Sequence, residues 1–162
     1  MTGGQKPTVP ANAPFTRRMV RRTILFLLAA LFFASCLRTE TTFVADVNPL
    51  SWGPAQPVEV VRGNLDTTGL YDLVLVVGYD ASAPAAEIPL TITTTAPDSS
   101  LVSEIVRLRI DKDGMKSSHP GECKQRYRYK ALFSQSGDYT FAFVPGHEVS
   151  GIRWVGLMFD KK

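Results

Sequence analysis

The fold class follows from one stretch in the middle of the chain, Leu70-Tyr71-Asp72-Leu73-Val74-Leu75-Val76-Val77-Gly78-Tyr79. Valine and leucine fill its centre, so a strand formed here has two apolar faces. A strand with two apolar faces lies inside a sheet, where both sides are covered. We therefore predict a central β-strand over residues 70–79.

Turn-forming residues divide the rest of the chain into further strand candidates, and no convincing helix pattern interrupts them. These candidates are residues 41–47, 57–62, 90–95, 103–110, 124–133, 138–144 and 152–159. Seven or eight short strands separated by Gly, Pro and Asp are typical of an antiparallel β-sandwich or jelly roll, with a partly closed barrel as the alternative. The sequence thus predicts an all-β fold, a single jelly-roll-like β-sandwich.

Alternation along two of these strands predicts which side chains enter the core. Two sets are expected to face inward: Tyr139, Phe141 and Phe143, and Ile152, Trp154 and Met158. The opposite face of the last strand is also apolar, so we expect this strand to be central or covered.

Composition limits the class of protein. The chain has 162 residues, 44% hydrophobic and 20% charged, which fits one folded domain and excludes a disordered or multi-span membrane protein. Five of the 18 bases and none of the 15 acids lie within residues 1–35, so the remainder is slightly acidic. The net charge of +3 therefore belongs to the leader and does not indicate a nucleic-acid partner.

The amino-terminal residues have the pattern of a signal peptide. A basic cluster at residues 17–22 precedes an apolar run at residues 23–34, which is shorter than the ~20 residues of a membrane-spanning helix. Met19 by itself opens a complete leader, so it is an alternative start to Met1. We predict a signal peptide over residues 1–35.

The leader ends in Phe33-Ala34-Ser35-Cys36, which resembles the lipobox of bacterial lipoproteins. The resemblance implies that the Cys36 thiol receives diacylglycerol, that the leader is cut before Cys36, and that the new amino end is acylated, for example with palmitate. Two or three such chains hold a protein stably on a bilayer. The alternative is a structural Cys36 beside an ordinary signal peptide. We expect a lipidated cysteine and short tether at 36–42 and the sandwich at 43–162.

A second resemblance covers most of residues 43–160. It is carried by Tyr71-Asp72-Leu73-x-Leu75, Ile88-Pro89-Leu90-Thr91-Ile92, Ser136-Gly137-Asp138-Tyr139-Thr140-Phe141 and Val149-Ser150-Gly151-Ile152-x-x-Val155-Gly156-Leu157. These segments resemble the gliding motility lipoprotein GldH family of the Bacteroidota, whose members combine a lipobox leader with one small β domain. The resemblance implies a non-catalytic envelope lipoprotein linked to the gliding machinery.

One predicted strand carries a basic pattern. Alternation places four bases on one face, Lys124, Arg126, Arg128 and Lys130. Gln125, Tyr127 and Tyr129 then share the other face. Because a row of like charges needs neutralising, we expect acids such as Glu104 or Asp113 opposite. The strip is either a solvated outer face or a patch for anionic lipid headgroups, lipopolysaccharide phosphate or an acidic partner; an exported protein is not expected to bind nucleic acid.

An aromatic contact site is the second candidate. Trp52 lies in a loop-like segment at residues 48–54, and Tyr127 and Tyr129 alternate with basic residues. Exposed rings of this kind stack on sugars, which gives a glycan-binding surface lipoprotein as the alternative function. A loop tryptophan also serves to plug the end of a sandwich.

Chemistry-bearing motifs are otherwise scarce. The two histidines, His119 and His147, are too few and too scattered for a metal site, and residues 111–114 are better explained as a turn than as a calcium loop. No nucleophile elbow or phosphate-binding glycine loop is present in the sequence. Cys123 is expected to be a buried small side chain, with a thiol that pairs with another molecule as the alternative. We expect no enzyme activity and no cofactor beyond the lipid on Cys36, with the bilayer and envelope proteins as partners and the outer membrane as the location.

Overall fold

The computed structural model describes residues 40–110 and 120–162. Its strands are β1 (Glu40–Asp46), β2 (Val58–Asn64), β3 (Leu70–Tyr79), β4 (Glu87–Thr95), β5 (Leu101–Arg109), β6 (Gly121–Leu132), β7 (Gly137–Pro145) and β8 (Ile152–Lys161). Every predicted strand is present, and the central one has the predicted bounds. Within these residues no helix has the length and apolarity needed to cross a membrane.

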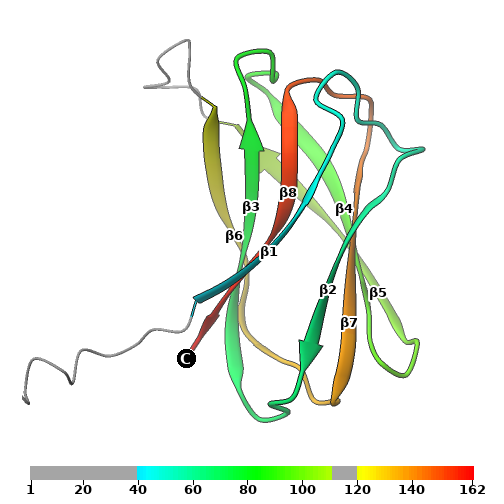
Figure 1. The fold of residues 1–162 in the computed structure, drawn as a ribbon, viewed down its shortest axis with the longest axis vertical. Coiled ribbons are helices and arrows are strands. Elements are labelled where there is room, and N and C mark those ends of the chain that lie inside the picture. Colours follow the sequence, from blue (N-terminus) through cyan, green and yellow to red (C-terminus); the bar gives the residue numbers. More distant parts are fainter. Residues whose placement is uncertain (1–39, 111–119) are drawn as a thin grey trace, which may run out of the picture. The chain divides into compact units, whose positions relative to one another are not determined.

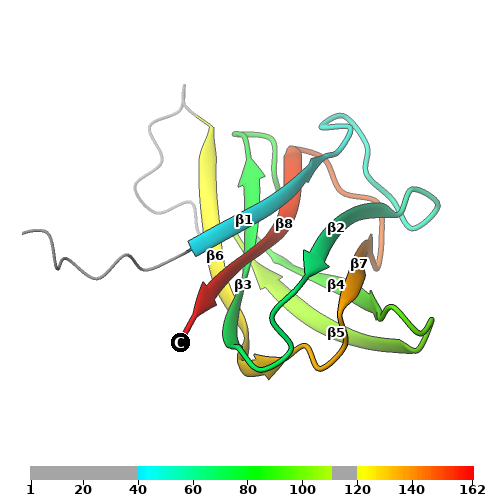
Figure 2. The same cartoon turned by 60° about the horizontal axis from the view of Figure 1, so that its bottom comes forward.

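The strands form two antiparallel four-stranded sheets that pack face to face (Figures 1 and 2). The first sheet has the order β1-β8-β3-β6 and the second the order β2-β7-β4-β5. Eight strands in this order are a jelly roll, because the chain passes from one sheet to the other along a folded double hairpin. The predicted β-sandwich is confirmed. The barrel alternative is excluded, because the strands form two separate sheets.

Aromatic rings fill the lower half of the core. Phe159 on β8 lies 5.7 Å from Phe43, 5.6 Å from Phe141 and 5.8 Å from Phe133 between ring centroids. Most of these rings meet edge to face, the arrangement that their quadrupoles favour. As predicted, β7 contributes Phe141 and its neighbours at alternate positions to this core.

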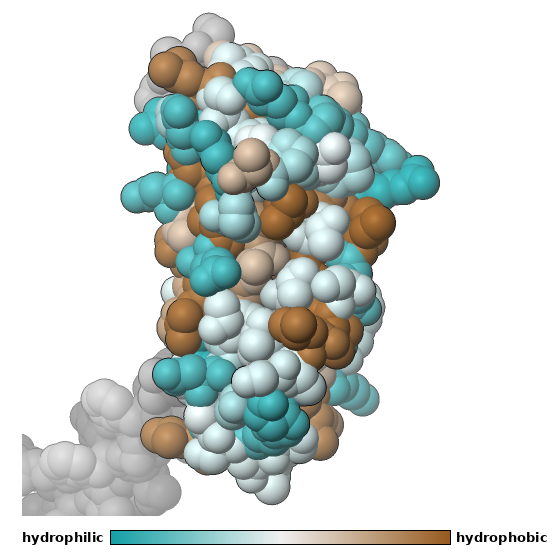
Figure 3. All heavy atoms as spheres, turned by 90° about the vertical axis from the view of Figure 1, so that its right-hand side faces the viewer, coloured by the Kyte–Doolittle hydropathy of each residue, from teal (hydrophilic) through white to brown (hydrophobic). Residues whose placement is uncertain are grey.

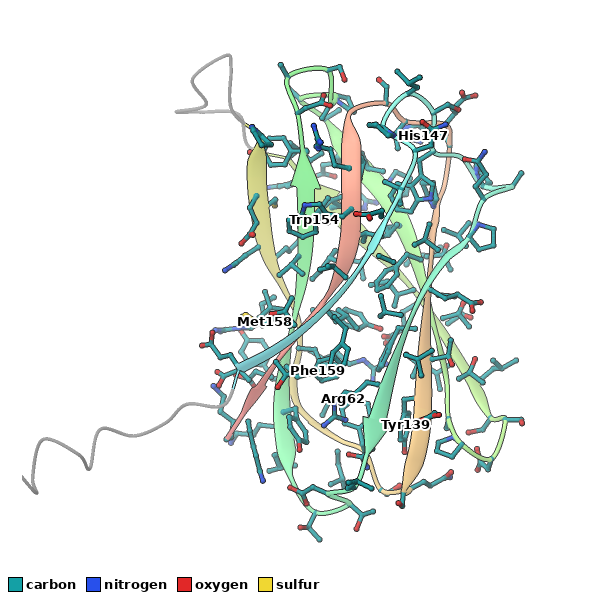
Figure 4. The ribbon with its side chains drawn as sticks, in the orientation of Figure 1. Arg62, Tyr139, His147, Trp154, Met158 and Phe159 are labelled. Carbon is teal, nitrogen blue, oxygen red and sulfur yellow. The ribbon has the colours of Figure 1, made fainter. Side chains whose placement is uncertain are left out.

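The predicted inward face of β8 is wrong beyond Ile152. Ile152 lies opposite Tyr79, but Trp154 lies opposite Gly78, so Arg153 is an extra residue in β8. This bulge reverses the alternation, because one additional residue moves every later side chain to the other face. Consequently Ile152 is buried together with the positions that alternate from 155 to 159, whereas Trp154 lies on the outer face (Figure 4). Met158 follows Trp154 outward.

The first strand begins earlier than expected. β1 starts at Glu40, which pairs with Asp160 of β8, so the sandwich begins three residues before the predicted boundary at Phe43. Any tether from Cys36 is correspondingly shorter than residues 36–42. The leader, Cys36 and residues 111–119, with Asp113 and His119, lie outside the described residues.

Candidate functional site

Strand β6 carries the bases of the predicted patch, Lys124, Arg126, Arg128 and Lys130. They do not share one face. Arg126 lies opposite Val74 and Arg128 opposite Leu73, which leaves Tyr127 as an extra residue. A second irregularity follows, because the pair Tyr129 and Lys130 stands across from Asp72 alone. The prediction of a single basic face is therefore wrong, since two bulges interrupt the alternation.

The first consequence is a polar cluster between the two sheets. Tyr127 Oη donates a hydrogen bond to Glu104 Oε2 of β5 at 2.6 Å, and Arg128 Nε donates to the same oxygen at 3.0 Å. The Arg128 guanidinium also lies 5.6 Å from the centroid of the Tyr127 ring. The expected neutralising acid, Glu104, is thus confirmed, and it joins the sheets at this edge of the sandwich.

The cluster changes the acidity of its members. The Tyr127 hydrogen bond, then that of Arg128, lowers the pKa of Glu104 below its usual value. Burial, reinforced by the negative charge of Glu104, raises the pKa of Tyr127 to about 12. Glu104 therefore stays charged and Tyr127 neutral at ordinary pH, so Arg128 meets its counter-ion within the fold and adds little unpaired charge to a patch.

The second consequence is an exposed pair on the outer face. Arg126 Nη1 donates to Tyr129 Oη at 3.0 Å, and its guanidinium lies 4.7 Å from the centroid of the Tyr129 ring. Tyr129 is 69% exposed. The prediction that Tyr129 shares a face with Tyr127 is wrong, because the bulges place Tyr129 beside Arg126 instead. Lys124 and Lys130 are exposed as well, so Arg128 is the one base of the predicted patch that is half-buried.

Gln125 closes the free edge of β5. Its Nε2 donates to the carbonyl of Arg107 at 2.9 Å, and its Oε1 accepts from the backbone N–H of Arg109 at 3.1 Å. The side-chain amide thus takes the place of a neighbouring strand on an edge that would otherwise be open to pairing. Cys123 is half-buried next to it, with Sγ 3.0 Å from the Arg109 carbonyl.

A hollow of about 550 Å³ lies between β5 and β6, lined by Glu87, Arg107, Arg109, Cys123, Lys124 and Gln125. Its bases have local acids: Glu87 Oε1 accepts from Arg109 Nε at 2.7 Å, and Lys124 Nζ lies 3.0 Å from Glu122. These ion pairs are exposed and screened by water. Lys124 therefore contributes little unpaired charge to a patch.

Trp52 is not the exposed ring that sugar stacking needs. It is 1% exposed, its backbone pairs with Val149, and its Nε1 donates to the carbonyl of Gln56 at 2.9 Å. The ring plugs the end of the sandwich, where burial of a large aromatic surface is favourable. The predicted aromatic contact at Trp52 is thus wrong, and Trp52 forms no platform with Tyr129.

The end of the core between β5 and β6 contains a cavity of about 310 Å³. Apolar side chains such as Leu73, Val102 and Phe133 line most of it, and Tyr127 and Arg128 stand at its wall. Since both of these polar residues are already bonded to Glu104, the cavity offers a small apolar space without an unpaired charge.

The residue that sequence reasoning missed is Arg62. It lies on β2 at an inward position and is 8% exposed. Its guanidinium carbon lies 4.4 Å from the ring centroid of Tyr71, 4.9 Å from that of Phe133 and 4.6 Å from that of Phe159. Figure 4 shows Arg62 between the sheets beside Phe159. Alternation with Val60 was the available signal, because it places this arginine on the core face.

A cavity of about 330 Å³ adjoins Arg62 at the edge where β1 and β2 meet. Its lining is Thr41, Phe43, Arg62, Gly63, Tyr71, Phe159 and Lys161. Three of the lining residues are aromatic, while the polar groups come from two bases and from the hydroxyls of Thr41 and Tyr71. This is the one cavity, among those described here, in which a buried base stands without an acid partner.

Residues 40–110 and 120–162 contain no group of three His, Cys, Asp or Glu side chains that could hold a metal ion. His147 is exposed at the upper end of the sandwich (Figure 4).

Comparison with known proteins finds matches among solved structures. No protein-family model matches the chain, and no curated protein does. Among solved structures, the chain is similar to the crystal structure of Yersinia pseudotuberculosis-derived mitogen (YPM), with a TM-score of 0.36 and 12% identity. The match covers 76% of this chain and 86% of that chain. Function is therefore argued from the chain's own residues.

Proposed function

We propose that the protein is a lipoprotein of the outer membrane whose sandwich is a non-catalytic binding or structural part of an envelope assembly, by resemblance that of gliding motility. The lipobox at Cys36 supports the anchor. The small sandwich supports a binding role, because two packed sheets present broad outer faces to a partner.

One surface carries this proposal, the centre of the outer face of the second sheet, here called the uncharged face. Its side chains are Val61, Pro89, Thr91, Thr93, Thr95, Leu101, Ser103, Ile105, Thr140, Ala142 and Val144. The charged side chains that also point outward from this sheet are Glu59, Glu87, Arg107, Arg109 and Asp138. Ile105 is 75% exposed and Val61 51%. Figure 3 shows apolar and weakly polar side chains over this face, with charged ones toward its borders. An uncharged centre with charged side chains around it is typical of a protein interface.

The tether fixes how the sandwich meets the bilayer. Only four Cα steps separate Cys36 from Glu40, where β1 begins, so these positions lie at most about 14 Å apart. Glu40 pairs with Asp160 near the carboxyl terminus, and Figure 1 shows the start of β1 beside the carboxyl terminus on the left-hand side of the sandwich, below its middle. This side therefore stays close to the membrane, and the uncharged face stands free for a protein partner.

The anchor has a direct test in metabolic labelling with palmitate. Wild-type protein is expected to take up the label and to fractionate with membranes, whereas Cys36→Ala should do neither. A matched substitution of the other cysteine, Cys123→Ala, should keep the label. Absence of label from the wild type, or its retention in Cys36→Ala, contradicts the proposal.

The uncharged face is tested by crosslinking in intact cells. Val61→Lys and Ile105→Lys place a charge on the face without touching the core, and we expect both to lose the crosslinked envelope partner of the wild type. Val44→Lys is the control, because Val44 is 49% exposed on the other sheet, close to the 51% of Val61. Partner capture that survives both changes on the uncharged face contradicts this role.

A further inference from the structure

The position of Arg62 calls for a counter-ion. The guanidinium is always charged in proteins, and a buried charge is costly unless something neutralises it. The described residues provide no acid in contact with it: Nη1 donates to Asn64 Oδ1 at 3.2 Å, and no ion pair joins it. The nearest charged pair at this cavity, Lys161 with Asp66 at 2.8 Å, is already matched within itself.

Two donors of Arg62 remain free of protein partners in the described ranges, and Arg62 lines the cavity. Nε and Nη2 of Arg62 have no hydrogen-bond partner in residues 40–110 and 120–162. In these residues the only side-chain polar atom that is both fully buried and without a partner is Asp160 Oδ1. Nε and Nη2 are therefore accessible to solvent. These two N–H groups form one edge of the guanidinium fork, the edge that binds two oxygens of an oxyanion side by side. The cavity that Arg62 lines is where such a group fits.

The aromatic rings hold the fork in place. Tyr71, Phe133 and Phe159 surround the guanidinium carbon at 4.4 to 4.9 Å. The rings cover the guanidinium by cation–π contact and leave its edge to the N–H donors. Asn64 fixes Nη1 and is itself held, because its Nδ2 donates to the carbonyl of Phe133 at 2.9 Å. A recognition group fixed before its ligand arrives loses little freedom on binding.

We propose that this cavity binds a singly charged phosphate ester, with Arg62 Nε and Nη2 as its donors and Thr41 Oγ1 at the rim. One unmatched base selects one negative charge, and the aromatic wall at Phe43 suits an apolar body attached to the phosphate. The choice of a phosphodiester over other oxyanions rests on the proposed anchor, because Thr41 follows directly after Glu40 on the side of the sandwich that the tether keeps near the bilayer. The phosphodiester is either that of a lipid headgroup or that of a free ester.

The test is a calorimetric titration of the full chain in neutral detergent. The two probes are glycerophosphoglycerol and a water-soluble short-chain phosphatidylglycerol. We expect binding to the wild type and at least a tenfold loss in Arg62→Met, which keeps the aromatic packing but removes the donors. Thr41→Val, outside the core, should weaken binding a few-fold. Arg107→Met removes an exposed base elsewhere and should change nothing.

The outcomes separate the sources and the explanations. Equal binding of both probes identifies a free ester, and binding of the lipid alone identifies a headgroup; both support the site. Binding of neither probe overturns it, as does unchanged binding by Arg62→Met. Competition by acetate as strong as that of either probe overturns the phosphate assignment. Because the titration does not require acylation, its result is independent of the palmitate experiment on Cys36.

Discussion

The carboxylate of Asp72 on β3 accepts a hydrogen bond from the backbone N–H of Lys130 on β6, at 2.9 Å. Lys130 has a φ of 49°, in the left-handed region, and stands where two residues of β6 oppose Asp72 alone. The same hydrogen bond is the main reason that the pKa of Asp72 is lowered. This contact holds the bulge, and the bulge decides that Tyr129 lies over Arg126 and not beside Tyr127.

Substitutions at Lys130 test this bulge. Lys130→Val should lower the free energy of unfolding by about 1–2 kcal/mol, because a branched side chain fits poorly in the left-handed conformation. Lys130→Gly is the matched control, since glycine adopts this φ without the steric cost. Urea unfolding of the two variants measures the difference, and equal stability of Val and Gly would show that the bulge is absent in solution.

The buried phenol of Tyr127 predicts a loss of stability at high pH. Its pKa is raised to about 12 in the folded state, mainly by burial and then by Glu104, against about 10 in the unfolded chain. Between these values the unfolded state releases a proton that the folded state keeps, so the stability from this group is complete below pH 10 and declines as the pH rises toward 12. Tyrosinate absorbance should show one late-titrating phenol, absent in Tyr127→Phe. A wild-type spectrum without a late phase refutes this environment.

Gly78 predicts a steric effect on the outer face. A Cβ at this position would lie 2.1 Å from the indole of Trp154, which covers the glycine. Gly78→Ala should therefore displace the indole, shift its fluorescence to longer wavelength, and cost roughly 1–3 kcal/mol of stability. Gly53→Ala is the control, because the nearest atom to its Cβ is 3.8 Å away. Recording the spectra in a Trp52→Phe background isolates Trp154, and no shift in Gly78→Ala would contradict the contact.

The edge of β5 predicts a change in hydrogen exchange. Gln125→Ala removes both hydrogen bonds to the β5 backbone, so the amide of Arg109 should exchange faster with solvent. Gln125→Glu keeps an acceptor for that amide and should retain most of its protection. Exchange followed by mass spectrometry on the β5 peptide distinguishes the two. Protection that is unchanged in Gln125→Ala means that the amide is shielded by something other than this side chain.

The local pattern was sufficient for the strands and for one contact of the site. Periodicity and turn residues predicted the bounds of β3 correctly, because a strand that is buried on both faces has apolar residues at consecutive positions. The requirement for an acid near the bases of β6 pointed to Glu104, which the structure places on Tyr127 and Arg128. In both cases a simple physical rule acts over neighbouring residues or between neighbouring strands.

The predictions that the structure corrects depend on contacts between residues far apart in the sequence. The predicted side-chain directions on β6 and β8 are wrong because an extra residue in a strand is recognised only from its pairing with the neighbouring strand. Tyr127 is the extra residue where β6 pairs with β3, and Arg153 is the extra residue where β8 pairs with β3. For Trp52, loop composition allowed both an exposed ring and a plug, and the fold decides for the plug, because the loop folds back over the end of the core.

By itself, the amino-acid order determined the alternation of apolar and polar residues, the turns, and the leader pattern that ends at Cys36, because each is a property of adjacent residues. Only the folded molecule decided that Arg62 is enclosed by Tyr71, Phe133 and Phe159. Those rings come from separate parts of the chain and meet where the two sheets pack. The charge of an arginine is fixed by its chemistry, but whether it lacks a counter-ion depends on which distant side chains surround it.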